Sequence, residues 1–245
     1  VDVCGHEVTH AVTTNSANLV YRYESGALNE SFSDIFGNAI EFFAKPIQFN
    51  WAIGEDITPN GTGIRNMKTP NSKGHPDSYK GKFWRTGTGD NGGVHSNSGV
   101  QNHWFYLLCH GGSGVNDKSE IYHVDSIGMT KAEQIAYRNL TVYLTRSSQY
   151  ADARLYAIQA AQDLYGYCSK ELIATTNAWH AVSVGEKYDS TELSIGFTGD
   201  SLFCHPPAIA HFTNLSVNAK NYKWSFGDGG SSTLASPNHT YLQYG

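Results

Sequence analysis

His6-Glu7-Val8-Thr9-His10 is the stretch that decides the fold and the chemistry of this sequence. Apolar residues at helical spacing predict a helix over residues 1–14, on which His6 and His10 lie one turn apart on the same face. Both imidazoles can then reach one metal ion, and Glu7 beside them can accept a proton from a water at that metal. The motif therefore predicts a metal site, and two ordinary histidines on an amphipathic helix are the alternative.

The second informative stretch is Asn29-Glu30-Ser31-Phe32-Ser33-Asp34, inside a helix predicted over residues 25–44. Glu30 and Asp34 stand in an otherwise apolar helix, where a buried carboxylate is costly unless it is paired or binds a metal. We interpret Glu30 as the third zinc ligand and Asp34 as an acceptor that holds a ligand imidazole by its other N–H. Such a set with an open fourth position is typical of catalytic zinc, and two solvated surface acids are the alternative.

Composition argues against several classes of protein and partner. The 245 residues are 40% hydrophobic and only 16% charged, so the chain can bury a core and is not kept disordered by charge. The net charge is −5 and no basic run occurs, which argues against nucleic acid or an anionic membrane as a partner. No apolar stretch approaches the roughly 20 residues of a membrane span. Cysteine zinc sites are disfavoured because the cysteines are widely spaced, at Cys4, Cys109, Cys168 and Cys204.

The spacing of apolar residues divides the chain into a helical part and a β part. The predicted buried stripe of the second helix is Leu28, Phe32, Ile35, Phe36, Ala39, Ile40 and Phe43. Further helices are predicted over 98–109, 130–145, 150–165 and 169–182, after a loop-rich stretch over 48–93. Beyond residue 185 the period changes to two, as in Leu193, Ile195 and Phe197. The predicted fold is mainly α over 1–185, then a linker over 186–190 and a partial all-β sandwich module over 191–245.

Four stretches of the helical part resemble the C-terminal lobe of the thermolysin family of neutral zinc metalloendopeptidases: VDVCGHEVTHAV, ESGALNESFSDIFG, IGEDI and DNGGVHSNSG. They occur in the family's order over residues 1–185, and the nineteen residues between His10 and Glu30 are the family's spacing. The resemblance implies the helical C-terminal lobe of an α+β metallopeptidase without its strand-rich N-terminal lobe. We therefore expect a fragment of a longer secreted, extracellular bacterial precursor that is poorly stable and poorly active without that partner lobe.

The same resemblance assigns roles to individual residues. It implies one catalytic Zn²⁺ held by His6, His10 and Glu30, with Glu7 as the general base and later the proton donor. The oxyanion that develops needs donors fixed in advance, and the matching residues are Tyr21 and His95. The other matches are Asp90, which orients His95; Arg65, which holds the substrate carbonyl past the cleaved bond; and the partners of the zinc histidines, Asn29 and Asp34. A packing role for Tyr21 and a surface position for Arg65 are the alternatives.

Substrate preference follows from four aliphatic matches to the family's pocket for the side chain after the cut: Val3, Ile53, Ile57 and Ile64. The resemblance therefore predicts cleavage of proteins or peptides before Leu, Phe, Ile or Val.

A calcium site is implied by Asp2, Glu41 and Glu55, since hard cations favour clusters of carboxylate oxygens. The sequence departs from the family's double site at two positions, where Asn50 and Ala52 replace carboxylates. We therefore expect one Ca²⁺ rather than two.

The β part resembles the PKD family of β-sandwich modules in Trp224-Ser225-Phe226-Gly227-Asp228-Gly229 and Ser236-Pro237-Asn238-His239-Thr240-Tyr241. Residues 191–245 are too few for a whole module, so the closing strands are expected to be missing. Such modules often act as spacers or binders of insoluble polymers. Trp224 and Phe226 are predicted to pack in the core rather than to bind such a polymer.

The predicted function is a zinc endopeptidase. A zinc aminopeptidase is one alternative, although that group has one residue fewer before its glutamate, and a non-catalytic binding protein with structural zinc is another. Two cysteine expectations complete the prediction: Cys109 and Cys168 could form a disulfide, and Cys4 is buried.

Overall fold

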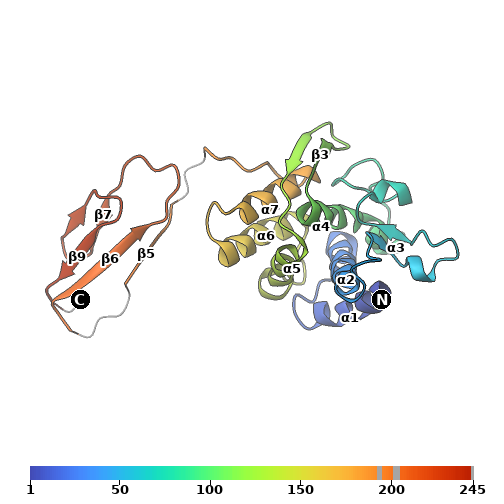
Figure 1. The fold of residues 1–245 in the computed structure, drawn as a ribbon, viewed down its shortest axis with the longest axis horizontal. Coiled ribbons are helices and arrows are strands. Elements are labelled where there is room, and N and C mark those ends of the chain that lie inside the picture. The colour runs from blue at the N-terminus through green and yellow to red at the C-terminus, as the bar shows by residue number, and fades with distance from the viewer. Residues whose placement is uncertain (192–194, 201–204, 244–245) are drawn as a thin grey trace. The chain divides into compact units, whose positions relative to one another are not determined.

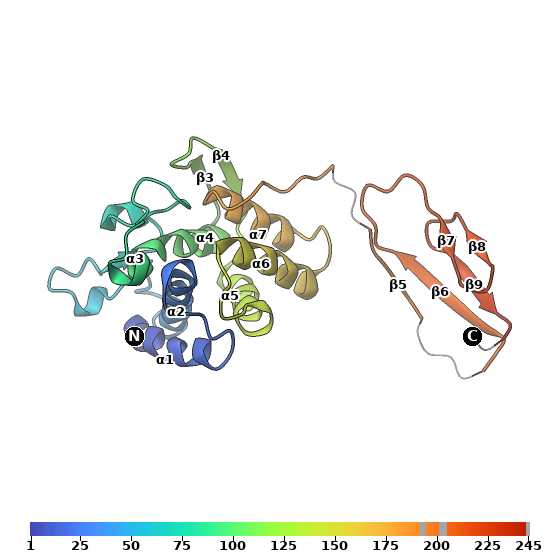
Figure 2. The ribbon, with the colours of Figure 1, turned by 180° about the vertical axis from the view of Figure 1, so that it is seen from behind.

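The computed structural model describes residues 1–191, 195–200 and 205–243. The chain forms two compact units, Val1–Tyr188 and Asp189–Gly245, drawn from opposite sides in Figures 1 and 2. Leu193 and Cys204, which the sequence singled out, lie outside the described residues.

The first unit consists mainly of α-helices. They are α1 (Asp2–Thr14), α2 (Tyr23–Ala44), α3 (Asp90–Asn97), α4 (Gly99–His110), α5 (Met129–Arg138), α6 (Tyr150–Tyr165) and α7 (Lys170–Ala181). Local signals start some of them: the Ser169 hydroxyl accepts a hydrogen bond from the backbone N–H of Leu172 at 3.2 Å and caps α7. Each of α4, α6 and α7 lies within one residue of its predicted bounds at both ends.

The helix predicted over residues 130–145 changes its character part of the way along. It is an α-helix only as far as Arg138 and continues as a π-helix over Asn139–Tyr143. The wider turn is visible in the bond from Leu144 N to Asn139 O, five residues back, at 3.1 Å. The side-chain amide of Asn139 donates to Ala153 O in α6 at 2.9 Å. That tertiary bond accompanies the wider turn, and local apolar spacing could not reveal it.

Two antiparallel hairpins lie between the helices. β1 (Ala52–Ile53) pairs with β2 (Arg65–Asn66) inside the stretch predicted as loop-rich, which also holds short 3₁₀ turns over Glu55–Ile57 and Pro70–Lys73. This pairing places Arg65 against α2. β3 (Gly112–Val115) and β4 (Ile121–Val124) form the second hairpin, after α4.

The helices α1 and α2 approach each other at backbone distance. A Cβ atom added to Gly37 would lie 2.4 Å from the carbonyl oxygen of Asp2 and 3.0 Å from the backbone nitrogen of His6. A Cβ on Gly5 would lie 2.9 Å from the Cα of Gly37. Because only glycine fits at this crossing, the histidine-bearing face of α1 lies directly against α2.

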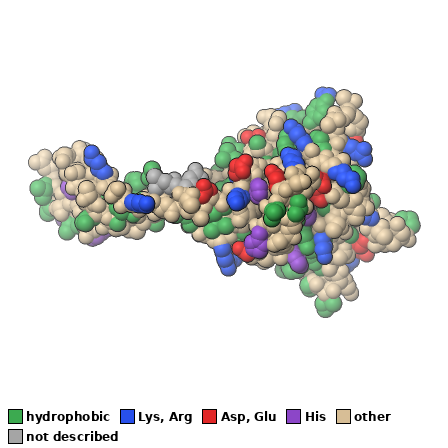
Figure 3. Space-filling view, turned by 90° about the horizontal axis from the view of Figure 1, so that it is seen from above, with side chains coloured by type: hydrophobic (Ala, Val, Ile, Leu, Met, Phe, Trp, Pro, Cys, Tyr) green, Lys and Arg blue, Asp and Glu red, His purple; other side chains and the backbone are tan. Residues whose placement is uncertain are grey.

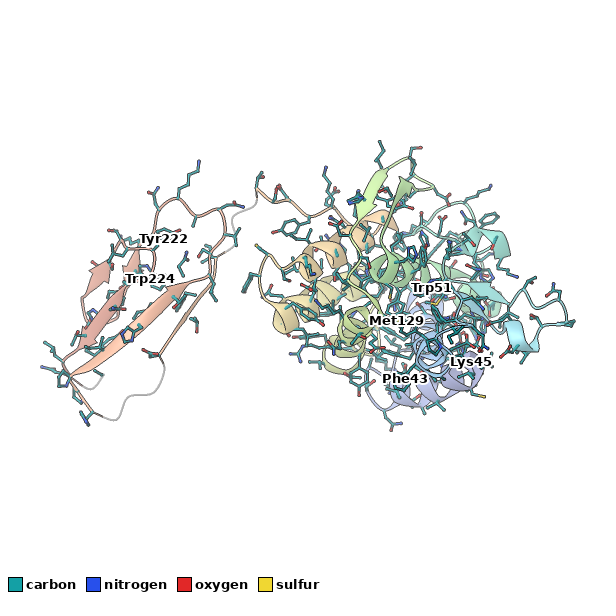
Figure 4. The ribbon with its side chains drawn as sticks, viewed as in Figure 1. Phe43, Lys45, Trp51, Met129, Tyr222 and Trp224 are labelled. Atoms are coloured by element: carbon teal, nitrogen blue, oxygen red, sulfur yellow. The ribbon has the colours of Figure 1, made fainter. Side chains whose placement is uncertain are left out.

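The core of the first unit is centred on α2, which packs against α1, α3, α4, α5 and α6. Leu28, Phe32 and Ile35 are fully buried there, and each contributes about 1.5–3 kcal/mol by its burial. The last part of the predicted stripe is wrong: Ile40 is 44% exposed and Phe43, labelled in Figure 4, is 90% exposed. In these last turns of α2 the packed side chains are Ala39 and Glu41, which are buried, rather than Ile40 and Phe43.

The second unit is all-β. β5 (Phe197–Gly199), β6 (Ala208–Asn214) and β9 (Asn238–Tyr241) form an antiparallel sheet in the order β5-β6-β9, and β7 (Trp224–Ser225) pairs with β8 (Ser231–Ser232). The ring of Phe212 lies 5.6 Å from Trp224 and 5.4 Å from Phe226, centre to centre. Trp224, labelled in Figure 4, also donates its indole N–H to Leu234 O at 2.8 Å. Both aromatic residues of β7 and its turn are half-buried against the sheet.

The cysteine expectations are wrong. Cys109 and Cys168 are both free, and Cys4 is exposed rather than buried. The Cys109 sulfur lies 3.8 Å from the sulfur of Met129, while the Cys168 sulfur accepts the hydroxyl of Tyr188 at 3.2 Å. Burial raises the pKa of the Cys109 thiol well above its usual value, so this group is a packed, unreactive side chain.

The surface of the first unit has no large concentration of one charge on the face shown in Figure 3, where Lys and Arg side chains are dispersed among acidic and apolar ones. Among the described residues, no helix combines the length and the apolar character that a bilayer-spanning segment requires.

Candidate functional site

Three side chains from α1 and α2 converge at the centre of the first unit. The Nε2 atoms of His6 and His10 lie 3.1 Å apart. The two carboxylate oxygens of Glu30 lie 3.5 Å from His6 Nε2 and 3.4 Å from His10 Nε2. Glu30 and His6 are buried, whereas His10 is partly exposed toward a cavity. The convergence follows from the glycine crossing, because it brings one turn of α1 within side-chain reach of α2.

The other nitrogen of each imidazole is held by a side chain of α2. His6 Nδ1 lies 2.8 Å from a carboxylate oxygen of Asp34, which as a carboxylate can only accept, so this nitrogen carries the proton. His10 Nδ1 donates at 2.8 Å to the carbonyl oxygen of Asn29, whose own amide N–H₂ donates to Leu19 O at 3.2 Å. With Nδ1 engaged on both rings, the two Nε2 atoms face each other and the carboxylate of Glu30, in position to act as metal ligands.

This donor set fits a divalent metal ion. Two imidazole nitrogens and a carboxylate at this distance repel one another unless a metal ion or a proton lies among them. The Oε2 atom of Glu30 is moreover buried without a hydrogen-bond partner in the part of the chain that the structure describes. Two imidazoles and one carboxylate, with a further position open to the cavity, are the ligand set of Zn²⁺ in hydrolytic sites.

Asp34 is the centre of a buried polar network behind His6. Arg65 donates to it from Nε at 2.7 Å and from Nη2 at 2.8 Å, and the amide of Asn102 donates at 2.8 Å. Burial alone would raise the pKa of Asp34, but the charge of Arg65 and the bonds from His6 and Arg65 outweigh it and hold that pKa well below its usual range. Arg65 is therefore a buried partner of Asp34 and not a surface arginine.

Sequence analysis missed Asn102, which completes this network from α4. Its side-chain oxygen accepts the hydroxyl of Ser31, and its nitrogen reaches Asp34. A polar residue next to the buried run Trp104–Leu108 was the available signal. Its partners could not be inferred, because 68 positions separate it from Asp34.

Tyr21, His95 and Asp90 form a chain of contacts on the His10 side of Glu30. The hydroxyl of Tyr21 donates to Oε1 of Glu30 and lies 3.1 Å from His95 Nε2. Asp90 holds His95 twice, at 2.5 Å through Nδ1 and at 3.0 Å through the backbone N–H. Burial, and then the hydrogen bond to Glu30, raises the pKa of Tyr21, so that its hydroxyl keeps its proton.

The run before His95 lies at the end of the stretch predicted as loop-rich and adopts a specific backbone conformation. It begins α3, and its four residues all have left-handed backbone angles: Asp90 (φ 53°), Asn91 (49°), Gly92 (93°) and Gly93 (80°). Glycine is needed at two of them, because a Cβ on Gly92 would lie 2.1 Å from the ring of Tyr23. The loop is therefore folded into a fixed shape that presents His95.

Glu7 is exposed and lines a cavity of about 590 Å³ together with the side chains just described. The lining also includes His6, His10, Tyr21, Glu30 and His95. The structure thus brings together the predicted metal ligands, the predicted base and the two predicted donors at one opening.

The four aliphatic residues predicted to bind the substrate side chain divide into two groups. Val3, Ile57 and Ile64 surround Gly54, since a Cβ there would lie 3.4–3.5 Å from each of them. Ile57 and Ile64 are 65% and 46% exposed, whereas Ile53 is only 1% exposed and lies in the core beneath them. Three of the four are therefore accessible to a ligand.

The predicted calcium residues also come together. One carboxylate oxygen each of Asp2, Glu41 and Glu55 lies within 4.8 Å of the others. Burial, and then the charges of Glu55 and Asp2, raises the pKa of Glu41. The Oε2 atoms of Glu41 and Glu55 are buried without a hydrogen-bond partner among the described residues. Asn50 points its amide nitrogen at Glu55, at 3.0 Å. Three carboxylates this close together, with Lys45 Nζ 3.9 Å from Glu41 as a partial counter-charge, fit one cation such as Ca²⁺.

Comparisons with known proteins agree with this geometry. The family described as thermolysin metallopeptidase, alpha-helical domain, matches residues 17–184. Over 189 residues, 75% of this chain, the sequence is 48% identical to bacillolysin of Bacillus cereus and to thermolysin of Alicyclobacillus acidocaldarius, covering 32% and 33% of those proteins. The chain therefore spans about a third of the length of the curated relatives it matches.

A solved structure agrees at the level of the fold. The precursor of protealysin, a metalloproteinase from Serratia proteamaculans, superposes with a TM-score of 0.62 at 30% identity, over 75% of this chain and 57% of that one. The family match, the sequence identity and the shared fold lead to one conclusion: this chain belongs to the thermolysin family of metallopeptidases and contains its alpha-helical domain.

Proposed function

We propose that the chain is the zinc-binding part of an endopeptidase that hydrolyses peptide bonds before bulky apolar residues. The observation that carries this proposal is the convergence of the two imidazole Nε2 atoms and the Glu30 carboxylate at one point. His6, His10 and Glu30 would hold one Zn²⁺, and Asp34 and Asn29 would fix the two rings through Nδ1.

Each polar group at the opening has a part in this reaction. Bound zinc would polarise the scissile carbonyl and bring the pKa of a water toward roughly 7. Glu7 would accept the proton of that water and later deliver it to the leaving amine. Tyr21 and His95 would donate hydrogen bonds to the oxygen on which negative charge develops. Asp90 would keep His95 oriented through Nδ1.

The substrate would lie across α1 with its apolar side chain near Gly54. Val3, Ile57 and Ile64 offer an aliphatic surface there, with Ile53 supporting it from beneath. Arg65 would hold the substrate carbonyl beyond the cut with guanidinium N–H groups that Asp34 does not use. A cleavage profile led by acidic or basic residues after the cut would contradict this assignment.

The test is zinc content and peptide cleavage by the full-length protein, as wild type, Glu7→Gln and Glu186→Gln. Glu186 is exposed outside the cavity and serves as the matched control. We expect one zinc in all three, cleavage before Leu by the wild type and the control, and a loss of about 10²–10⁴-fold in kcat for Glu7→Gln. Zinc binding with no cleavage by any of them would favour a structural zinc.

The aminopeptidase alternative is tested with the same proteins. An N-acetylated peptide has no free amine to anchor, so an aminopeptidase leaves it intact, whereas the proposed endopeptidase cleaves it internally. Mass spectrometry of the products distinguishes the two.

We further propose one Ca²⁺ at Asp2, Glu41 and Glu55. Calorimetric titration of the metal-free protein should give one tight site, and Asn50→Asp should increase the affinity because it adds a fourth carboxylate beside Glu55. Two tight sites in the wild type would contradict the proposal.

We also propose that residues 191–245 belong to a PKD-like β-sandwich module after a linker at 186–190, following the zinc-binding part at 1–185. Its support is the division of the chain at Asp189 and the aromatic packing of Trp224 and Phe226 on β6.

We place the protein in the extracellular space of a bacterium, with a strand-rich lobe as partner of the helical unit. Cell fractionation that recovers the protein only inside the cell would contradict this location, and pull-down on collagen or insoluble polysaccharide tests polymer binding by the module.

A further inference from the structure

A second pocket of about 690 Å³ adjoins the catalytic cavity, and the two share Val20 in their walls. Three cationic side chains line it, from segments far apart in the sequence: Arg22, Lys80 and Arg85. We call it the cationic pocket. Tyr23 and Trp84 supply aromatic walls.

Two of the cations are held in place by aromatic rings. The guanidinium carbon of Arg22 lies 4.7 Å from the ring centre of Tyr23, and its Nη2 lies 3.2 Å from the Tyr23 hydroxyl oxygen. The ammonium of Lys80 lies 4.8 Å from the ring centre of Tyr79. Both charges are therefore restrained before any ligand arrives, which lowers the entropy lost on binding.

The third cation is held by the folded loop that presents His95. The backbone N–H and C=O of Arg85 both bond to the side chain of Asn97, at 2.9 and 3.0 Å. A Cβ on Gly93 would lie 2.6 Å from the Cβ of Arg85, so only glycine allows Arg85 to approach. The same left-handed residues thus position both His95 and one wall of the cationic pocket.

The positive charge of the pocket is only partly offset from within. Its one lining carboxylate, Glu24, accepts the Tyr79 hydroxyl at 2.7 Å and the backbone N–H of Tyr150 at 3.2 Å. The carboxylate of Asp90 nearby is engaged with His95. Among the described residues, none of the three cations forms an ion pair with a carboxylate.

The position of the pocket relative to Glu30 indicates which part of a substrate it meets. Arg65 lies on the Oε2 side of Glu30, with its Nη2 atom 3.8 Å from Oε2. The aliphatic residues around Gly54 are on the same side, since Ile64 directly precedes Arg65 and Ile53 pairs with it. Tyr21 bonds to Oε1, on the opposite side, and the chain continues from it directly into Arg22. A substrate whose residue after the cut lies near Gly54 therefore extends its preceding residues toward the cationic pocket.

We propose, on the basis of the endopeptidase function above, that the cationic pocket is a substrate subsite that binds an acidic side chain on the N-terminal side of the scissile bond. Three cations that form no ion pair among the described residues, two of them held by aromatic rings, complement such a side chain, and Val20 lines both this pocket and the catalytic cavity.

The test uses matched peptides with the full-length, zinc-loaded protein. Each peptide has Leu after the cut, and Asp or its neutral isostere Asn occupies one of the four positions before it. We expect kcat/KM for Asp to exceed that for Asn by about threefold to fivefold at one or two positions, with the ratio approaching one at 1 M salt.

The variants locate this preference. Arg22→Gln/Lys80→Gln/Arg85→Gln should abolish the Asp-to-Asn ratio, and Arg85→Gln alone should reduce it. Lys170→Gln, which removes an exposed cation at the start of α7, should leave the ratio unchanged. Circular dichroism establishes that each variant is folded.

The outcomes separate the two proposals. Equal cleavage of Asp and Asn peptides at every position would overturn the subsite while leaving the endopeptidase function intact. A preference that survives the triple substitution would also overturn it, because another group would then bind the acid. If the wild type cuts no peptide, the endopeptidase function is wrong and the subsite is wrong with it.

Discussion

The buried pair Asp34–Arg65 allows a quantitative prediction about the support of the metal site. Asp34→Asn removes the charge that faces the Arg65 guanidinium and keeps nearly the same shape. Arg65→Met removes the other charge while retaining an unbranched side chain. Both residues are at most 7% exposed, so neither remaining charge can recover its hydration.

The magnitude follows from the contacts that each variant loses. Asp34→Asn leaves the guanidinium facing an uncharged amide where it had two charge-assisted bonds of 2.7 and 2.8 Å. A buried charge that loses its main partner costs about 3–5 kcal/mol in the free energy of unfolding, and Glu30 Oε2, 3.8 Å from Nη2, is the counter-charge that remains. The double variant removes both members of the pair, so neither is left facing a neutral group. Its loss of stability should therefore be smaller than the sum of the two single losses by about 2–3 kcal/mol.

The assay is urea unfolding of the metal-free protein, followed by tryptophan fluorescence, for the wild type, both single variants and the double variant. Four of the five tryptophans lie in the first unit and report on it: Trp51, Trp84, Trp104 and Trp179. Ser31→Ala is the control, since it loses one neutral hydrogen bond worth about 1 kcal/mol. A coupling energy below about 0.5 kcal/mol would falsify the reasoning, because the pair would then be no more than additive.

Two further predictions concern the helix crossing and a pH-dependent bond. Gly37→Ala should destabilise the protein by more than about 1 kcal/mol, because the new Cβ would lie 2.4 Å from Asp2 O; Gly87→Ala, with open space around its Cβ, is the thermal-unfolding control. The hydrogen bond from Asn116 is the largest of the effects that lower the pKa of the Glu120 carboxyl in the folded protein. The ionised carboxylate therefore stabilises the fold fully above about pH 4.5, and this contribution is lost as the pH falls through the lowered pKa. Glu120→Gln should therefore be less stable than the wild type at pH 7, and a gap that does not narrow on acidification contradicts this.

Much of the fold could be predicted from local patterns, because helix starts and apolar stripes are local properties of a sequence. The bounds of α6 follow from its spacing and its flanking residues. The π-turn at Asn139 could not be predicted in the same way, since it coincides with a bond to Ala153 in another helix. The burial of Phe43 was predicted wrongly for a related reason. Helical periodicity shows which face of a helix is apolar, but it does not show how far along that face other elements pack.

The same distinction between local patterns and long-range contacts applies to the candidate site. The spacing of His6, His10 and Glu30 could be interpreted because all three lie on two consecutive helices. The conformation of the run before His95 could not be predicted, because glycine and asparagine permit many conformations and only packing against Tyr23 selects one. Asn102 and the pairing of Arg65 depend on contacts across 31 to 68 positions, which local spacing does not contain.

The glycine crossing of α1 and α2 also has a consequence for the order of folding. The two helices that hold the ligand set are consecutive in the chain, so their docking closes only a short loop and costs little chain entropy. Arg65 and His95 join from later segments. We therefore expect the helix pair to form a local nucleus in which the metal ligands are assembled first, with the supporting and substrate-facing groups added as longer-range contacts form.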